Sequence, residues 1–310
     1  MKTLVSIGIP LKNEAENIST LKDNITVFIN SPKYFEIDFE VIVNDNLSTD
    51  GSATLLDQWS TEDSRIKVSH LIQPLEFQAT ISNLMSKAKG ESFALFQSDL
   101  QDPIEVLEEM LDTWLDNRSF IVAGKVNSKD EFFLTFFLRK IFYFLLDVSS
   151  DKSYTSGFQD FYILPKYVYS QIASLPTHNM FIRGYLNYSF SQIKYIQYKR
   201  NRRSAGQSKF NFSRMYDLAL DGLLLYGRKF IRILSIVSFC VFTLSSISLL
   251  LILVLALIGF EPGIKGWMSI ACGVSILLSL FGIVAGVLLE YLIRIHRTLH
   301  LTTKNFPDGL

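Results

Sequence analysis

The sequence predicts an α/β domain built on a mainly parallel sheet, followed by two helices that cross a membrane. In the first two-thirds of the chain, short apolar runs alternate with amphipathic helical patterns. This alternation is typical of βαβ units, whose strands pair in parallel. In the last third, the nearly unbroken apolar runs Ile233–Phe260 and Trp267–Ile293 each exceed the roughly 20 residues that a helix needs to cross a bilayer.

Short apolar runs are the expected strands, and the patterns between them are the expected helices. The strands are Leu4–Pro10, Phe39–Val43, Ile66–Leu71, Phe93–Phe96 and Phe120–Gly124. The helices are one through Leu21, Ile25 and Phe28, then Ala53–Trp59, Ala79–Ala88 and Ile104–Leu115. Strands and helices that follow one another in this way build a layered α/β domain.

The last of these helices carries a start signal. Asp102 is the expected N-cap, Pro103 the first helical residue, and Glu105 the partner in a capping box. Capping would occupy Asp102 and would leave Asp99 and Gln101 available for another role.

Composition excludes several classes of protein. Lysine and arginine number 30 and balance 30 acidic residues, so the charge does not favour nucleic acid as a partner. The cysteines Cys240 and Cys272 both lie in apolar runs, where we expect small apolar fillers rather than a disulfide or a zinc site. The four histidines are scattered without ligand spacing, which argues against a histidine metal site. The chain enters a strand at once, so we expect no secretory signal.

Polar residues gather at predicted strand ends and in polar loops. The groups are Pro10, Asn13 and Glu14; Asp45 and Asp50; Asp99, Gln101 and Asp102; and the stretch 156–161, which contains Asp160. Because the carboxyl ends of parallel strands form one crevice, we expect Asp45 and Asp99 to share a ligand site. Oxygen ligands at such an edge suit a hard cation that carries a phosphate-bearing substrate.

Two further segments are amphipathic, and one is basic. Residues 132–148 are rich in phenylalanine around Arg139 and Lys140, which suits either an interfacial helix, the interpretation we prefer, or a core helix on the sheet. Residues 211–228 are a second candidate for an interfacial helix. The basic segment 199–209 is either a loop that faces lipid headgroups or a phosphate clamp.

Charges that flank the apolar runs predict the topology. Basic residues precede the first run and follow the second: Arg228, Lys229 and Arg232, then Arg294, His296, Arg297 and Lys304. By the positive-inside rule, the domain and both termini are cytosolic, with two spans in the plasma (inner) membrane. Gly282 and Gly286 form a Gly-x-x-x-Gly spacing that suits close helix packing, within the hairpin or between the subunits of a homo-oligomer.

Several motifs together resemble family 2 glycosyltransferases of the GT-A fold, which has a Rossmann-like sheet. Within that family, the chain resembles the polyisoprenyl-phosphate glycosyltransferases, the group that contains dolichol-phosphate mannose synthase and the bactoprenol glucosyltransferases. The matching stretches are Ile9–Asn17, Asp45–Ser52, Asp99–Pro103, Asp160–Phe161, Phe181–Gly184 and Gly206–Phe210, followed by the paired spans.

The resemblance implies transfer of a sugar from a nucleotide diphosphate sugar to a membrane polyprenyl phosphate, giving a lipid-linked sugar for modification of cell-surface glycans. Asp160 takes the position of the catalytic base, and Asp99 with Gln101 takes that of the ligands for Mg²⁺ or Mn²⁺. The implied nucleotide-sugar contacts are Pro10, Asn13, Glu14, Asp45 and Asp99, and the implied phosphate contacts are Arg183, Arg202, Arg203 and Lys209.

Three positions depart from the family pattern. Gln97 stands where the metal motif has its first aspartate, residues 74–77 replace the usual Asn-x-Gly region, and Tyr162 replaces an arginine. The loss of a carboxylate at Gln97 leaves its metal role open and motivates an alternative, a weak or non-catalytic membrane scaffold that binds nucleotide sugar. A transferase that acts on a growing polysaccharide is a further alternative.

The expected domain organisation follows from these assignments. We predict a cytosolic catalytic domain over residues 1–210, with the interfacial helix at about 132–148 inside it. A juxtamembrane amphipathic helix over 211–230, a transmembrane hairpin over 231–295 and a cytosolic tail over 296–310 complete the chain.

Overall fold

The computed structural model describes residues 2–126, 157–175, 182–190, 192–201, 228–259 and 266–301. The chain divides into two compact units, one formed by residues 1–139 and 154–218 and the other by residues 140–153 and 219–310. The predicted interfacial helix at 132–148 and the basic residues 202–209 lie outside the described residues.

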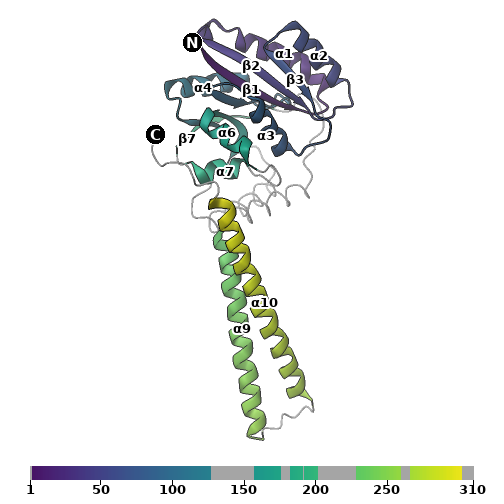
Figure 1. Ribbon diagram of the computed structural model, residues 1–310, viewed down its shortest axis with the longest axis vertical. Coiled ribbons are helices and arrows are strands. Elements are labelled where there is room, and N and C mark those ends of the chain that lie inside the picture. The colour runs from purple at the N-terminus through teal and green to yellow at the C-terminus, as the bar shows by residue number, and fades with distance from the viewer. Residues whose placement is uncertain are drawn as a thin grey trace. The chain divides into compact units, whose positions relative to one another are not determined.

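The first unit is built on a seven-stranded mixed sheet (Figure 1). Its strands are β1 (Thr3–Leu11), β2 (Ile37–Asp45), β3 (Ile66–His70), β4 (Ser92–Leu95), β5 (Ile121–Val126), β6 (Phe158–Pro165) and β7 (Ile193–Tyr198). The order is β3-β2-β1-β4-β6-β5-β7. All neighbours pair in parallel except β6, which is antiparallel to both β4 and β5. The prediction of a mainly parallel sheet is confirmed.

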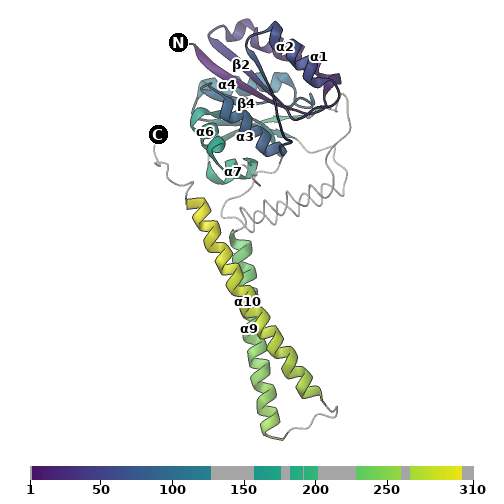
Figure 2. The same cartoon turned by 45° about the vertical axis from the view of Figure 1, so that its right-hand side comes forward.

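Helices cover both faces of this sheet. They are α1 (Ala15–Ile29), the 3-10 turn η1 (Pro32–Tyr34), α2 (Ser52–Glu62), α3 (Phe77–Lys87), α4 (Ile104–Asp116), α6 (Lys166–Ser174) and α7 (Ile182–Ser189). The large core cluster joins the sheet to α1, α2 and α4, whose buried residues include Leu21, Trp59 and Trp114. Helices α3 and α6 pack against each other (Figure 2) and contribute no residue to that cluster. The sheet is therefore covered on both sides, and the ends of its strands are left for a site.

The start of α4 differs from the prediction. The helix begins at Ile104 with Pro103 as its N-cap, and no side chain caps it. The Asp102 side chain is instead fully buried, and its Oδ1 accepts hydrogen bonds from the Tyr198 hydroxyl at 2.5 Å and from Arg200 Nε at 3.2 Å. The predicted capping box is wrong because partners from the end of β7 draw the carboxylate away from the helix.

Asp160 also lies elsewhere than the sequence suggested. It sits inside β6 rather than in a loop or at a strand end, and this strand lies between β4 and β5 in the sheet. Two strands, β6 and β7, were not among the predicted strands. The five predicted ones are all present, with ends that differ by only a few residues.

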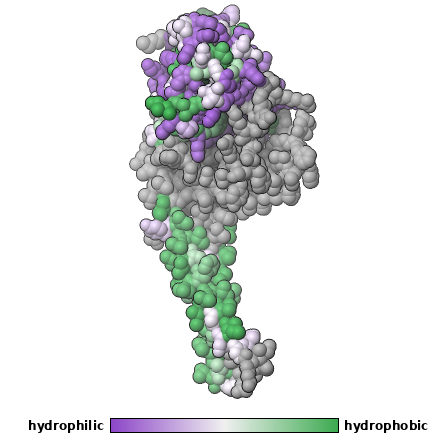
Figure 3. Space-filling view, turned by 90° about the vertical axis from the view of Figure 1, so that its right-hand side faces the viewer, coloured by the Kyte–Doolittle hydropathy of each residue, from purple (hydrophilic) through white to green (hydrophobic). Residues whose placement is uncertain are grey.

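The second unit contains a hairpin of two long helices, α9 (Arg228–Leu257) and α10 (Trp267–Leu301). Each contains a segment long and apolar enough to cross a membrane, Ser235–Leu257 and Ser269–Leu292. Only 11% and 17% of these segments is buried, and Figure 3 shows their outer surface as strongly hydrophobic. Helices buried in the core of a soluble domain would not expose so large an apolar surface.

Candidate active site

Loops after β1 and β2 are joined by hydrogen bonds. The Asn13 amide donates to Ser48 Oγ at 2.8 Å, and Asn13 Oδ1 accepts a hydrogen bond from the Thr49 amide at 2.7 Å. The Glu14 amide donates to Ser52 Oγ at 3.1 Å in the same way. The predicted nucleotide-sugar residues Asn13 and Glu14 therefore lie beside the loop that starts at Asp45, and their backbone is held there by that loop.

The third neighbouring strand, β4, is joined to the same edge. Ser98 Oγ, just after this strand, donates to the Pro10 carbonyl at 3.0 Å. Since β1 pairs with both β2 and β4, Pro10 and Asp45 lie at the carboxyl ends of β1 and β2, and Asp99 follows the adjacent strand β4. The structure thus brings the predicted nucleotide-sugar residues to one edge of the sheet, as the strand-end argument expected.

Left-handed backbone marks the same edge. Among the described residues, three that are not glycine have positive φ angles: Asn13 at 53°, Leu47 at 55° and Leu100 at 55°. Each follows one of the strands β1, β2 and β4. Such a conformation costs roughly 1–2 kcal/mol for a residue with a Cβ atom, and it clusters at functional sites. Strained turns after three adjacent strands support a ligand site at their ends.

Asp45 is buried, with its side chain only 4% exposed, and both of its oxygens have protein partners. Oδ1 accepts a hydrogen bond from the Ser48 amide at 3.0 Å, and Oδ2 lies 2.9 Å from His70 Nδ1. The other ring nitrogen, Nε2, lies 3.0 Å from Asp57 Oδ1 on α2. These two carboxylates raise the pKa of His70, Asp57 having the larger effect. The sequence analysis missed His70 because nothing in its local pattern indicates this pair of partners.

Asp99 and Gln101 form a tight turn beyond β4. Asp99 Oδ1 accepts a hydrogen bond from the Gln101 amide at 3.2 Å, and Asp99 Oδ2 lies 3.8 Å from Arg200 Nη2. The Gln101 carbonyl accepts a hydrogen bond from the Asn201 amide at 2.8 Å. Arg200 thus places a positive charge beside the predicted metal ligand. The basic segment 199–209 contained this signal, but the prediction chose later residues of it.

Gln97 connects this turn to the predicted catalytic residue. Its Nε2 donates to the Asp160 backbone carbonyl at 3.1 Å. The Asp160 carboxylate faces Arg183 of α7, with Oδ2 3.2 Å from Nε, and both side chains are mostly buried. Arg183 Nη1 also donates to the Phe158 carbonyl at 3.1 Å. The predicted phosphate residue Arg183 is therefore the ion-pair partner of Asp160.

One oxygen of the Asp160 carboxylate is left without a hydrogen bond from the described residues. Among the described residues, Asp160 Oδ1 is buried and finds no hydrogen-bond partner. Tyr162, two residues along the same strand, is fully buried, and burial raises the pKa of its hydroxyl well above the ordinary value. A buried carboxylate oxygen without a partner is costly, so its retention is typical of a functional site.

The residues around Asp99 fit a divalent cation only in part. Among the described residues, no group of three acidic, histidine or cysteine side chains is placed to hold a metal ion. Magnesium and manganese commonly bind through one or two carboxylates together with the phosphates of a substrate. Asp99, with Gln101 beside it, suits a site of that kind, which the donor diphosphate would complete. Arg202, Arg203 and Lys209 lie outside the described residues.

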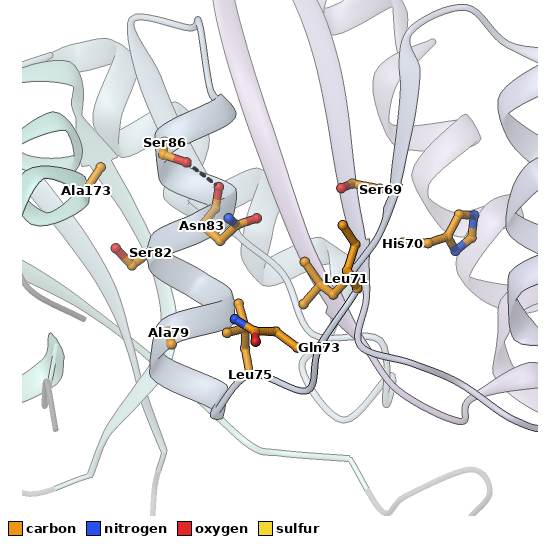
Figure 4. Close-up of a pocket in the computed structure, with 11 residues that line it drawn as sticks. Ser69, His70, Leu71, Gln73, Leu75, Ala79, Ser82, Asn83, Ser86 and Ala173 are labelled. Atoms are coloured by element: carbon orange, nitrogen blue, oxygen red, sulfur yellow. Dashed lines mark hydrogen bonds between the residues drawn. The ribbon is translucent and has the colours of Figure 1, made fainter. Parts of the chain in front are cut away.

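An open groove of about 520 Å³ lies between the end of β3 and α3 (Figure 4). Its walls include His70, Gln73 and Asn83, and the predicted site residues are not among them. The groove therefore meets the strand-end site described above at His70, whose ring contacts Asp45.

Comparison with known proteins identifies the family. The profile of glycosyl transferase family 2 matches residues 6–183, more than half of the chain and most of the sheet. The chain belongs to glycosyl transferase family 2. Membership of this family agrees with the GT-A-like sheet of the first unit.

Relatives in sequence match almost end to end. The uncharacterized glycosyltransferase YkcC of Bacillus subtilis is 26% identical, over 97% of this chain and 94% of its own length. A prophage-derived bactoprenol glucosyl transferase of Shigella flexneri is also 26% identical, over 98% of this chain and 96% of its own.

Solved structures share the fold. Mannosyl-3-phosphoglycerate synthase from Rubrobacter xylanophilus superimposes with a TM-score of 0.51 at 13% identity, over 75% of this chain and 74% of its own. Glucosyl-3-phosphoglycerate synthase from Mycobacterium tuberculosis, in complex with Mn²⁺ and UDP-glucose, gives 0.50 at 15% identity, over 72% of this chain and 77% of its own. At these identities the likeness concerns the fold alone.

Proposed function

We propose that this glycosyltransferase moves a sugar from a nucleotide diphosphate sugar to a polyprenyl phosphate and so makes a lipid-linked sugar. The observation that carries the proposal is the gathering of Asp45, Asp99 and Asp160 around one edge of the sheet, in a chain that also contains two lipid-compatible helices. Full-length similarity to bactoprenol glucosyl transferases supports a lipid-phosphate acceptor.

Donor binding is assigned to the loops after β1 and β2. Asp45 would accept a hydrogen bond from the nucleotide base, and Pro10, Asn13 and Glu14 would line the same wall. The hydrogen bonds that Asn13 donates to Ser48 and accepts from the Thr49 amide hold this wall in shape before the donor arrives. A site organised in advance loses less conformational freedom when it binds, which favours affinity.

Asp99 is assigned to the diphosphate end of the donor. A divalent cation bound there, Mg²⁺ or Mn²⁺, would neutralise charge that develops on the departing nucleotide diphosphate. Gln101 supports Asp99 through its amide, and Arg200 adds a guanidinium beside it. The Gln97 side chain, two residues before Asp99, donates a hydrogen bond to the Asp160 carbonyl.

Asp160 is assigned to the acceptor. A lipid phosphate is already ionised near neutral pH, so the Asp160 carboxylate need not remove a proton and serves mainly to orient the acceptor. Arg183 compensates the charge of Asp160, and together with Arg202, Arg203 and Lys209 it would offer cationic groups to phosphate.

We further propose the membrane arrangement that the charge pattern predicts. Residues 1–210 would form the cytosolic catalytic domain and 211–230 a juxtamembrane helix. Residues 231–295 would span the plasma membrane twice, and 296–310 would return to the cytosol. Basic residues at both ends of the hairpin support this orientation.

A transfer assay tests the proposed reaction. Full-length protein in lipid nanodiscs is given radiolabelled nucleotide sugars, Mn²⁺ and undecaprenyl phosphate, and the label extracted into the organic phase is counted. Asp99→Asn keeps the shape of the side chain and removes its charge, so we expect transfer to fall about a hundredfold or more. Asp112→Asn removes a surface carboxylate of α4 that pairs with Lys33, and it serves as the matched control.

Different outcomes separate the alternatives. Unimpaired transfer by the Asp99 variant would refute the metal role. Nucleotide-sugar binding without transfer to any polyprenyl phosphate would favour the scaffold, and label retained in a growing polymer would favour a polysaccharide transferase.

A further inference from the structure

His70 makes two contacts that none of the roles assigned above requires. It ends β3, and each of its ring nitrogens lies within hydrogen-bond distance of a carboxylate, Asp45 on one side and Asp57 on the other. Asp45 is buried, whereas Asp57 is 66% exposed on the surface of α2. The ring thus connects the buried base-binding carboxylate to a surface helix.

The geometry requires a particular protonation state. An ionised carboxylate only accepts hydrogen bonds, and a neutral imidazole carries a single N–H. Contacts of 2.9 and 3.0 Å from both nitrogens to carboxylates can both be hydrogen bonds only if the ring is protonated. The bridge between Asp45 and Asp57 is therefore complete only in the imidazolium form.

Charges on the neighbouring elements do not compete for the ring. Lys87 of α3 donates to Ser69 Oγ and Asn44 Oδ1, and Lys67 pairs with Glu40. Ser69 and His70 are neighbours in a strand, so their side chains point to opposite faces of the sheet. Figure 4 shows the His70 ring turned away from α3. Among the described residues, the acidic groups in contact with the ring are Asp45 and Asp57.

We propose that His70 is a positioning residue of the donor site, whose protonated ring holds the Asp45 carboxylate for the nucleotide base. The inference rests on the proposed donor role of Asp45. Without the bridge, Asp45 Oδ2 loses its charged partner and the carboxylate keeps only the Ser48 amide. Donor affinity then falls, while the steps after binding, which involve Asp99 and Asp160, are unchanged.

The direction of the pH effect follows from the two carboxylates. They raise the pKa of His70 above its ordinary value of 6.5. A raised pKa in the folded protein means that the bridge is complete below pH 6.5 and is lost as the pH rises through the folded value. Donor affinity should therefore be highest at mildly acidic pH and decline above it.

Direct binding measurements test the inference. Full-length protein in nanodiscs is titrated with UDP-glucose and, separately, GDP-mannose, at fixed Mn²⁺ and at pH values from about 5.5 to 8.5. We expect His70→Gln to weaken binding about three- to tenfold at low pH, the scale of the net contribution of one hydrogen bond, and to abolish the pH dependence. His70→Arg keeps a charged donor and should retain the low-pH affinity at high pH.

Two further variants sharpen the test. Asp57→Asn removes the larger cause of the raised pKa, so the decline in affinity should move to lower pH. Glu62→Gln is the matched control, because it breaks the ion pair of the same helix with Lys22 and touches neither His70 nor Asp45. It should bind the probes as the wild type does.

The outcomes are distinguishable. If the wild type binds neither probe, the proposed donor site fails, and this inference fails with it. If the wild type binds but His70→Gln matches it at every pH, or if the variant changes kcat and leaves KM unaltered, only the inference on His70 is overturned.

Titration of the His70 ring by NMR in the absence of donor is an independent measurement, and a pKa at or below 6.5 would contradict the bridge. Should His70→Gln fold poorly, Asp57→Asn and the NMR titration still give the answer.

Discussion

Leu47 is the least expected of the three left-handed residues. It lies in the loop after β2 and is 41% exposed, so little burial compensates for its strained backbone. Asparagine tolerates this region because its short polar side chain can bond locally, whereas leucine cannot. The strain is therefore stored in the loop whose Ser48 amide donates a hydrogen bond to Asp45.

This strain predicts a stabilising substitution. Leu47→Asn relieves the left-handed conformation without adding the unfolded-state freedom of glycine, so we expect a gain of about 0.5–1 kcal/mol, or about 2–3 °C in Tm. Leu47→Ala keeps a Cβ atom and should bring no gain. Thermal unfolding of the full-length protein at one scan rate compares the three. A lower Tm for the asparagine variant would show that Leu47 packs in a way that outweighs its strain.

Packing between α9 and α10 depends on one glycine above all. A Cβ atom at Gly282 would lie 2.8 Å from two backbone atoms of α9, Phe242 N and Ser238 O. The neighbouring Gly286 faces the Phe239 ring. The Gly-x-x-x-Gly spacing is thus used inside the hairpin, which leaves the predicted homo-oligomer without this support. Cross-linking in native membranes that yields only monomer would count against an oligomer.

A larger residue at Gly282 should open the hairpin. Gly282→Leu forces the two backbones apart, with a cost for overpacking of about 1–3 kcal/mol, whereas Gly273→Leu meets open space and is the matched control. The readout is the rate at which a disulfide forms between α9 and α10. For this, Ser246 and Ser279, whose hydroxyls lie 3.3 Å apart, are both replaced by cysteine, and Cys240 and Cys272 are removed. We expect the disulfide to form several-fold more slowly with Gly282→Leu alone. Equal rates in both glycine variants would contradict this packing.

The proposed topology places the first unit in the cytosol and the turn between α9 and α10 on the other side of the membrane. Single cysteines test it in intact cells, in the same cysteine-free background. Val27 in the first unit and Ile258 at the end of α9 are both more than 70% exposed. A membrane-impermeant maleimide should label Ile258→Cys at once and Val27→Cys only after the membrane is permeabilised. Labelling of Val27→Cys in intact cells would reverse the proposed orientation.

The local sequence pattern was sufficient to predict most of the helices and strands of this protein. Strands β1 to β5, helices α1 to α4 and the two apolar helices were all predicted, because each depends on the periodicity of its own residues. The sequence also predicted that Asp45 and Asp99 lie at the carboxyl ends of parallel strands. The structure has both at one edge of the sheet, because such strand ends meet there.

Only the tertiary structure showed which side chains act together. Tyr198 reaches Asp102 from 96 residues away, and this contact overrode the predicted cap of α4. His70 meets Asp45 across 25 residues, and Arg183 closes on Asp160. β6 was missed for a local reason, because the stretch 156–161, which contains Asp160, was grouped with the polar loops and strand ends. Periodicity reports how one segment buries its own face, whereas the partners of a buried charge depend on how distant segments fold together.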